Sequence, residues 1–358
     1  MNRIRFAFWN LQNFFDTDDD PISQDFEFTR ARGWTPALYE AKKRNLAAVL
    51  DALFEGETLD LLAVCEIEKD AMLQELVDAS RHRHLRVVMD PSGTSDLRGI
   101  DTAVAFNPQQ LEVVGEPVSH LLHLRYRTRD ILEVRFRVRA TGELFVLLVN
   151  HWPSRSAGKW ETEALRIAVA ENLSHLLDRH LKVSSEEYLE LRSRQDLEAV
   201  RRKWDTKILL LGDFNDEPFD RSLLHHLKAT GDLDRVVGET NDIDKFEREP
   251  ARYREQDFFL FNASWRLLAE EPGGSYFLDR TYSGKLARRY QLLDQVIASR
   301  GLLLDQGLHL DRERVRVFRQ RGLNATRSWR PKPFDRQTQT GSSDHFPVLG
   351  ELVTGSAV

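Results

Sequence analysis

Apolar and polar residues alternate along several stretches of the chain, which is the pattern of β-strands that are buried on one face. The clearest stretch is 131–139, where the even-numbered positions are apolar and the odd-numbered positions from 133 onward are charged. The turn Thr141-Gly142 then leads into a second strand at 144–149, so the two strands form a hairpin. We interpret the face that carries Arg135, Arg137 and Arg139 as a solvated face or edge of a sheet.

Two shorter runs are mainly apolar, which predicts strands that are buried on both faces. The first is 59–65, and it ends at Glu66. The second is 208–211, and it runs directly into Gly212-Asp213-Phe214-Asn215, so a carboxylate and a carboxamide lie side by side at a sheet edge. Further strands are expected at 3–9, 85–90, 101–107, 257–261, 290–299, 314–319 and 346–353.

Apolar residues at helical spacing predict helices between these strands. One helix begins at Thr35-Pro36, since Thr can cap the first turn and Pro fits within it, and extends to about residue 54. Its residues Lys42, Lys43 and Arg44 are expected on a solvated face. Further helices are expected at 69–82 and 160–181.

A highly charged helix is expected at 184–204. Ser184 and Glu187 form a capping box at its start, and the pair Glu190 and Arg194 is typical of a solvent-facing helix. We interpret this helix as an insertion in a single domain of residues 1–358. Because strands outnumber helices and several pair as hairpins, two packed sheets covered by helices fit the pattern better than a doubly wound parallel sheet.

The bulk properties narrow the range of functions. The chain has 358 residues, of which 41% are hydrophobic and 30% charged, so it can bury a large core. Its formal net charge of −6 argues against tight, non-specific coating of DNA. A phosphate substrate is still compatible with this charge, because a divalent cation can supply a local positive field.

Features of the whole sequence also bear on compartment and partners. The sole cysteine, Cys65, excludes a disulfide within the chain and fits a reducing compartment. The first nine residues alternate like a strand and lack the apolar centre of a signal peptide. No apolar run approaches the roughly 18 residues of a membrane span. We therefore expect a soluble, cytoplasmic protein with no membrane association and no obligate protein partner.

Polar residues stand at the ends of six predicted strands, where a rigid scaffold can hold reactive groups. A carboxylate within an apolar strand costs free energy unless it is paired, so Asp294 needs a partner, and His345 is the natural one. Taken singly, the others have ordinary interpretations as turn residues or exposed strand-end charges. The six clusters are Asn10, Glu66, Asn150-His151, Asp213 with Asn215, Asp294, and Asp344-His345.

These motifs and their order along the chain resemble those of the endonuclease/exonuclease/phosphatase superfamily, which are DNase I-like, metal-dependent phosphoesterases. The resemblance covers about residues 3–353, and the Gly-Asp-x-Asn and Ser-Asp-His motifs are specific when they occur together. The form Asn150-His151-Trp152-Pro153-Ser154-Arg155 is similar to that of a bacterial subgroup. The resemblance implies an α+β fold, a four-layer α/β/β/α sandwich of two mixed, mainly antiparallel sheets flanked by helices.

The resemblance also implies a cofactor. Glu66 would hold a divalent cation, usually Mg²⁺ with Mn²⁺ as the alternative, with help from Asn10 and Asp344. Mg²⁺ prefers oxygen ligands and keeps waters and substrate phosphate in its shell, which suits one or two carboxylates. Gln12 stands where relatives close to exonuclease III often carry an aspartate, which argues against a second metal and against repair of abasic sites.

Catalytic roles follow from the same resemblance. His345 would orient or deprotonate the attacking water, and Asp294 would fix its tautomer. Asp213 would help to activate the water or protonate the leaving group. Asn215 would donate hydrogen bonds to a phosphate oxygen, and His151 would donate to another or assist as an acid.

Three further residues are candidates for binding the substrate phosphate. Arg155 is one, because a guanidinium fork matches phosphate oxygens. Asn150 and Arg98 are the others, although Arg98 has the alternative of a surface ion pair. The arginine-rich stretch 312–336 is expected to form a loop on the substrate side.

The leading interpretation is a Mg²⁺-dependent phosphodiesterase, a nuclease, acting on nucleic acid. The alternative is a phosphatase or phosphodiesterase acting on small-molecule or lipid phosphate esters. The acidic composition favours small substrates, whereas the arginines of 312–336 favour a polyanion. A third interpretation, a catalytically silent binding protein, predicts loss of Glu66, Asp213 or His345, and all three are present.

Overall fold

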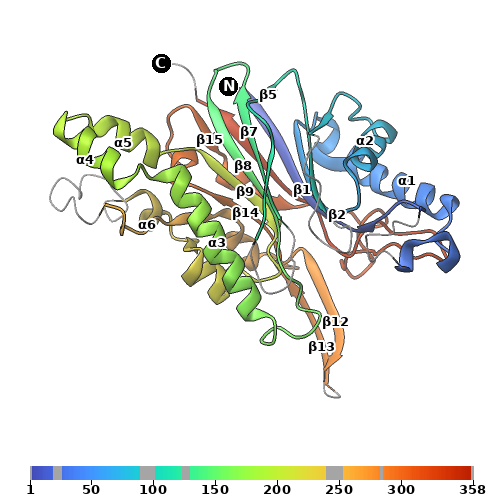
Figure 1. The fold of residues 1–358 in the computed structure, drawn as a ribbon. Coiled ribbons are helices and arrows are strands. Elements are labelled where there is room, and N and C mark those ends of the chain that lie inside the picture. The colour runs from blue at the N-terminus through green and yellow to red at the C-terminus, as the bar shows by residue number, and fades with distance from the viewer. Residues whose placement is uncertain are drawn as a thin grey trace.

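The computed structural model describes residues 2–18, 26–88, 101–122, 130–238, 253–282 and 285–355. Two mixed sheets pack face to face, and helices cover their outer sides (Figure 1). The predicted fold of two packed sheets flanked by helices is therefore confirmed. Of the helices in the described part of the chain, none combines the length and the apolar character that crossing a bilayer requires.

The first sheet is built around the N-terminal strand. β1 (Arg3–Phe14) pairs in parallel with β2 (Leu61–Ile67) and antiparallel with β17 (Val348–Thr354). Helices α1 (Pro36–Ala52) and α2 (Asp70–Ala79) cover its outer face. The other strands are β3 (Arg86–Val88), β4 (Asp101–Phe106), β15 (Leu308–Leu310) and β16 (Arg316–Val317), and the order is β15-β17-β1-β2-β4-β3 with β16 beside β17.

The second sheet has β9 (Ile208–Asp213) near its centre. β9 pairs in parallel with β8 (Leu144–His151) and antiparallel with β14 (Asp294–Ala298). Helix α3 (Glu163–Leu181) packs on the outer face together with α4 (Ser185–Ser193) and α5 (Leu197–Trp204). The remaining strands are β5 (Leu111–Val113), β6 (Val118–His120), β7 (Ile131–Val138), β10 (Ala229–Thr230) and β11 (Leu260–Asn262), in the order β10-β11-β14-β9-β8-β7-β5 with β6 beside β7.

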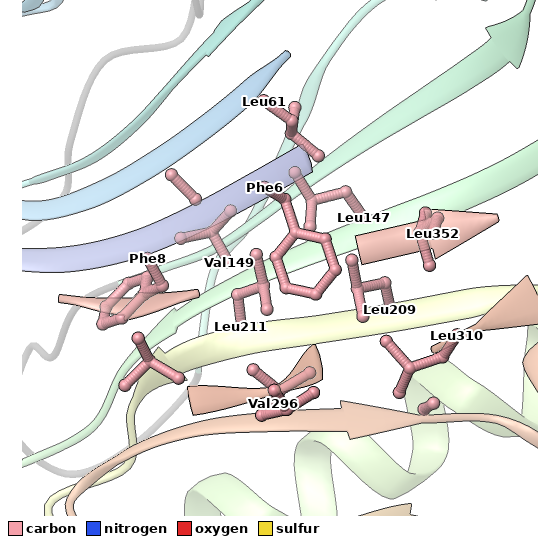
Figure 2. Close-up of a cluster of buried hydrophobic side chains, with 14 of the residues drawn as sticks. Phe6, Phe8, Leu61, Leu147, Val149, Leu209, Leu211, Val296, Leu310 and Leu352 are labelled. Carbon is pink, nitrogen blue, oxygen red and sulfur yellow. The ribbon is translucent and has the colours of Figure 1, made fainter. Parts of the chain in front are cut away.

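The main core lies between the two sheets, because alternate side chains of each strand point inward. Figure 2 shows Phe6 and Phe8 of the first sheet among Leu147, Leu209 and Leu211 of the second. Each of these side chains is fully buried or nearly so, and such burial contributes about 1.5–3 kcal/mol per residue. This core fixes which positions on each strand face the other sheet, and therefore which strand-end residues can meet.

A two-stranded ribbon projects from the body of the protein (Figure 1). It consists of β12 (Tyr276–Tyr282) and β13 (Lys285–Gln291). The sequence predicted one strand over 290–299, but β13 ends at Gln291 and β14 begins at Asp294. The break arises because the backbone N–H groups of Leu293 and Asp294 donate to Ser275 Oγ, at 3.2 and 3.1 Å.

The charged segment 184–204 also differs from the prediction, because it forms two helices. Ser184 accepts a hydrogen bond from the backbone N–H of Glu187, as the capping box predicted. The first helix ends at Ser193, and Asp196 caps the second by accepting from the N–H of Ala199. The charged stretch 230–257 has little apolar spacing and its sequence predicts a loop, but it contains the short helix α6 (Leu233–Val237). Its part at 239–252 lies outside the described residues.

Candidate active site

Strand ends from both sheets meet at one edge of the inter-sheet core. In the second sheet, Asp213 lies opposite His151 on one side and opposite Asp294 on the other. All three continue the inward-facing rows that form the core. From the first sheet, Asn10 Nδ2 reaches Asp213 Oδ2 at 3.1 Å. The hydrogen bond between Asn10 and Asp213 therefore links the two sheets at this edge.

His345 is held against Asp294, as its sequence pattern predicted. Its Nδ1 lies 2.7 Å from Asp294 Oδ2, and its Nε2 lies 3.9 Å from Asp213 Oδ2. The backbone fixes the ring as well, because Trp9 Nε1 donates to the carbonyl of His345 and Ser343 Oγ accepts from its N–H. Nδ1–H is thus committed to Asp294, and Nε2 faces Asp213.

Glu66 reaches the site through a β-bulge. Regular alternation along β2 would place Glu66 on the outer face with Leu62 and Val64. Instead the register between β2 and β4 shifts after Cys65, and Glu66 adopts a left-handed φ of 60°. A non-glycine residue in this region is strained by about 1–3 kcal/mol, and such strain is typical of functional sites.

The bulge gives the Glu66 carboxylate three neighbours. Asn10 Nδ2 donates to Oε1 at 3.1 Å, and His151 Nε2 lies 3.5 Å from the same oxygen. The backbone N–H of Asn13 donates to Oε2 at 2.9 Å. Glu66 and Asp213 therefore share the amide of Asn10, whose own oxygen accepts from the N–H of Gln12.

Negative charge is concentrated in this cluster. Burial raises the pKa of Asp213 to about 7, and Asp294 and Glu66 add to the shift while His345 opposes it. Burial also raises the pKa of Asp344, and Glu66 adds to it. For His345, burial opposes the charged ring, but Asp294 and Asp213 outweigh this effect and raise its pKa. Carboxylates so close together repel one another unless a cation lies among them.

The donor atoms present fit a divalent cation. Oxygen or nitrogen atoms of Asp213, Asp294 and His345 lie within 4.8 Å of one another, so these three residues can hold a metal ion. The neighbouring Glu66 adds a fourth donor that is more exposed, at 19% of its side-chain surface. Asp344 is half-buried next to His345. The site thus offers oxygen ligands from both sheets.

The amide groups predicted to bind phosphate differ in where they lie. Asn215 is at the site, with a left-handed φ of 50° and its N–H donating to Asp213 Oδ1. Asn150 lies on the opposite face of its strand from His151 and is fully buried. Its Nδ2 donates to the carbonyl of Leu148 and its Oδ1 accepts from Trp152 Nε1. Its side chain is thus directed away from the cluster.

Arg155 was expected to bridge to the phosphate, but its guanidinium contacts carboxylates instead. One NH₂ group donates to Asp216 at 2.7 Å and also to Asp220, and Nε donates to the carbonyl of Asn215. Arg155 thereby ties the loop after β8 to the loop after β9. The remaining phosphate candidate, Arg98, lies outside the described residues.

Lys42 is buried, although its helical pattern predicts a solvated face. Its side chain lies under the irregular end of β1, where the backbone turns and Gln12 and Asn13 both have left-handed φ values, of 54° and 53°. Its ammonium donates to the carbonyls of both residues. Burial lowers the pKa of Lys42 to about 7, although Glu66 and Asp344 oppose this shift. Helical spacing alone does not show that a strained turn covers this face.

Replacing Lys42 with methionine is expected to destabilise the protein by about 1–3 kcal/mol, because the two carbonyls lose a buried donor. Urea denaturation followed by circular dichroism measures this difference. Arg44, on the exposed side of the same helix, provides the control, and Arg44→Met should change the free energy of unfolding by no more than about 0.5 kcal/mol. Equal effects of the two substitutions would contradict the structural role of Lys42.

Known structures share this fold. TDP2 from D. rerio, solved with a single-strand DNA product, has a TM-score of 0.54 at 12% identity, with 99% of this chain and 100% of that chain covered. A Bacteroides thetaiotaomicron mannosyl-6-phosphatase has a TM-score of 0.51 at 15% identity, with 98% of this chain and 99% of that chain covered. The human Nocturnin catalytic domain with bound sulfate has a TM-score of 0.51 at 14% identity, with 98% of this chain and 94% of that chain covered. Identities this low show the fold alone.

The sequence itself matches a family. The Endonuclease/Exonuclease/phosphatase family matches residues 5–353. No curated protein sequence matches the chain at a significant level. Because the family match spans nearly the whole chain, and because the buried cluster of Asp213, Asp294 and His345 lies where it can hold a metal ion, the protein belongs to the endonuclease/exonuclease/phosphatase family of metal-dependent phosphoesterases.

Proposed function

We propose that this protein is a Mg²⁺-dependent phosphodiesterase that cleaves nucleic acid. The oxygen-rich set of Glu66, Asn10 and Asp344 is the proposed cation site, because Mg²⁺ prefers oxygen ligands to imidazole. Mn²⁺ would be accepted by the same ligands. A cation held there would polarise the substrate phosphate and stabilise charge on the leaving oxygen.

Proton transfer would be carried out by the residues around Asp213. In its neutral form, His345, with Nδ1–H held by Asp294, would use Nε2 to take a proton from the attacking water. The imidazolium so formed would be stabilised by Asp294 and by Asp213. Asp213, with its pKa near 7, can give a proton to the leaving oxygen at neutral pH. His151 and Asn215 would donate to phosphate oxygens.

The observation that carries the nucleic-acid assignment is a pair of exposed aromatic side chains on loops that continue from two strands of the site. Trp160 is 70% exposed and Phe219 is 47% exposed. They lie on the loops that follow β8 and β9, the strands that end in His151 and Asp213. Lys159 joins the two loops, with Nζ 2.5 Å from Asp220 Oδ1 and lying over both rings, at 5.2 and 5.9 Å. A lysine between two exposed rings suits a substrate with both bases and phosphates.

Arginines also lie over aromatic rings in the segment that precedes Phe334. Arg330 lies over the ring of Phe277 in the projecting ribbon at 4.2 Å, and Arg321 lies over Trp329 at the same distance. The segment continues to Phe334, whose N–H donates to Gln12 Oε1, two residues from Asn10. Arginines therefore extend from the ribbon to the rim of the site, which favours a polyanionic substrate over a small ester.

Incubation with plasmid, single-stranded DNA and RNA in the presence of Mg²⁺ or Mn²⁺ tests the proposal. Cleavage of any of these polymers, abolished by EDTA, is the expected result. Turnover of a generic phosphomonoester without cleavage of polymers would favour a phosphatase of small molecules instead. Absence of any turnover would favour a silent binding protein.

Replacing Trp160 with alanine is expected to raise the KM for single-stranded DNA by roughly five- to a hundredfold, since stacking on a base contributes about 1–3 kcal/mol. Hydrolysis of bis(p-nitrophenyl) phosphate, which has no nucleobase, should not change. Leu189→Ala, on α4, removes another apolar side chain that is 58% exposed and should affect neither substrate. An equal loss on both substrates would show that Trp160 supports the catalytic centre rather than a base.

A further inference from the structure

A second concave site lies on the outer face of the second sheet. It is a pocket of about 420 Å³ lined by the C-terminal ends of α3 and α5, by strands β6, β7 and β8, and by Val114, which follows β5. Val146 lines it, five residues before His151 on β8, which corresponds to roughly 16 Å along the strand. Val146 faces outward and His151 inward. The pocket is thus separate from the catalytic cluster, and its volume lies in the range of small-molecule sites.

Among the described residues that line the pocket, Glu133 is the only carboxylate, and its neighbours already hold it by hydrogen bonds. Glu133 is buried on β7, and its Oε2 lies 2.7 Å from His120 Nε2 and 3.0 Å from His180 Nε2. Arg135 Nε donates to Oε1 at 2.9 Å. Burial would raise the pKa of Glu133, but these hydrogen bonds outweigh burial and lower it. Glu133 therefore stays ionised and is held by three donors.

Two cations in the same pocket have no such partner. Arg179 lies in the last turn of α3 and Lys203 in the last turn of α5, and both line the pocket. Within the described ranges, neither forms an ion pair with a carboxylate. Arg135 adds a third positive group, since only its Nε is used on Glu133 and its side chain is 58% exposed. Lys207 is not available, because its ammonium donates to the carbonyl of Leu308 at 2.7 Å.

Cations near helix C-termini are common, because they interact favourably with the helix dipole. The helix dipole explains why positions 179 and 203 carry positive side chains. It does not explain why a pocket lies between Arg179 and Lys203. The hydroxyl of Thr206 lies 2.7 Å from the carbonyl of Lys203 and 3.2 Å from that of His180, so it bridges the two helix ends. Leu144, Val146 and Leu176 form an apolar wall beside the cations, and Leu144 is 52% exposed.

We propose that this pocket binds a small phosphorylated molecule, with its phosphate between Arg179, Lys203 and Arg135. The planar or apolar part of the ligand would lie against Leu144 and Leu176. Arginine and lysine are the side chains that recognise phosphate, and an apolar wall with a few convergent polar groups is typical of a ligand site. Three accessible positive groups around one pocket contrast with the net charge of −6 of the whole chain.

The arginine face of β7, which the sequence pattern predicts to be solvated, lines the pocket in part. Glu133 and Arg135 belong to that face, but α3 and α5 cover it at this point and close one side of the pocket. The ligand would not be the nucleic acid in the active site, because the pocket lies on the other face of the sheet. It would be a separate, effector-like molecule, and its binding does not depend on the proposed reaction.

Titration calorimetry of the full chain with AMP, in EDTA and at low ionic strength, tests the proposal. We expect one AMP to bind per chain. Lys203→Glu and Arg179→Glu should each weaken AMP binding by at least about tenfold. Each replaces a positively charged hydrogen-bond donor with a carboxylate, which repels the phosphate. Inorganic phosphate should bind more weakly than AMP, and adenosine should not bind, because the phosphate and the apolar wall act together.

Arg202→Glu is the matched control. Arg202 precedes Lys203 on α5, is largely exposed and pairs with Glu198 at 4.0 Å, so its substitution should leave AMP affinity unchanged. Hydrolysis of bis(p-nitrophenyl) phosphate should be the same in all three variants. The proposal is overturned if the wild-type chain binds neither AMP nor phosphate, or if Lys203→Glu and Arg179→Glu bind AMP as tightly as Arg202→Glu does.

Discussion

Replacing His345 with alanine is expected to reduce phosphodiester hydrolysis by at least about a hundredfold, because the site loses the group that exchanges a proton with the attacking water. The ring is positioned for that role. Its Nδ1 lies 2.7 Å from Asp294 Oδ2, and its Nε2 faces Asp213. Steady-state kinetics at saturating metal, with bis(p-nitrophenyl) phosphate and with DNA, measures the loss. Both substrates should be affected alike.

A matched control separates chemistry from folding. His226 is another histidine that pairs with a carboxylate, Glu171, but both side chains are partly exposed to solvent, at 27% and 51% of their surfaces. His226→Ala should keep the wild-type rate. The His345→Ala protein should still unfold cooperatively, although with lower stability because Asp294 loses its partner. Wild-type turnover by a folded His345→Ala protein would contradict the proposed role.

Some of the site could be predicted because its residues stand out against an apolar background. Asp213 follows a run of four aliphatic residues, and Asp294 interrupts another apolar stretch. A buried carboxylate needs a partner, so pairing Asp294 with His345 was a physical expectation, and the hydrogen bond is present. The two-sheet fold was predicted on similar grounds, from alternation and from hairpin turns.

Other features depend on backbone geometry that the residue pattern does not show. Glu66 faces the cluster only because a bulge reverses its direction, and Lys42 is buried only because the turn at Gln12 and Asn13 covers it. Arg155 finds its carboxylates some sixty positions later in the chain. Asn150 differs from these residues, because strand alternation alone places it on the face opposite to His151. The sequence pattern could therefore have excluded Asn150 as a phosphate-binding residue.

Replacing Glu66 with glutamine is expected to raise the metal concentration needed for half-maximal activity by at least about tenfold. The substitution removes one negative charge from the proposed cation site, and losses of 10–100-fold in metal affinity follow even from changes to groups that only support the ligands. Glutamine keeps an oxygen that can accept from the N–H of Asn13, so the bulge should persist. Titration of activity with Mg²⁺ and with Mn²⁺ measures the shift.

Glu68→Gln is the control for this substitution, since Glu68 is a buried carboxylate two residues away that accepts from the backbone of Asp16 instead of facing the cluster. Its metal requirement should not change. Calorimetric titration of both variants with Mn²⁺ gives a readout that is independent of turnover. If Glu66→Gln and the wild type require the same metal concentration, the cation would have to be assigned to Asp213, Asp294 and His345. Glu66 would then serve to hold Asn10 and His151 in place, and the strain at its φ of 60° would support hydrogen bonding and not metal binding.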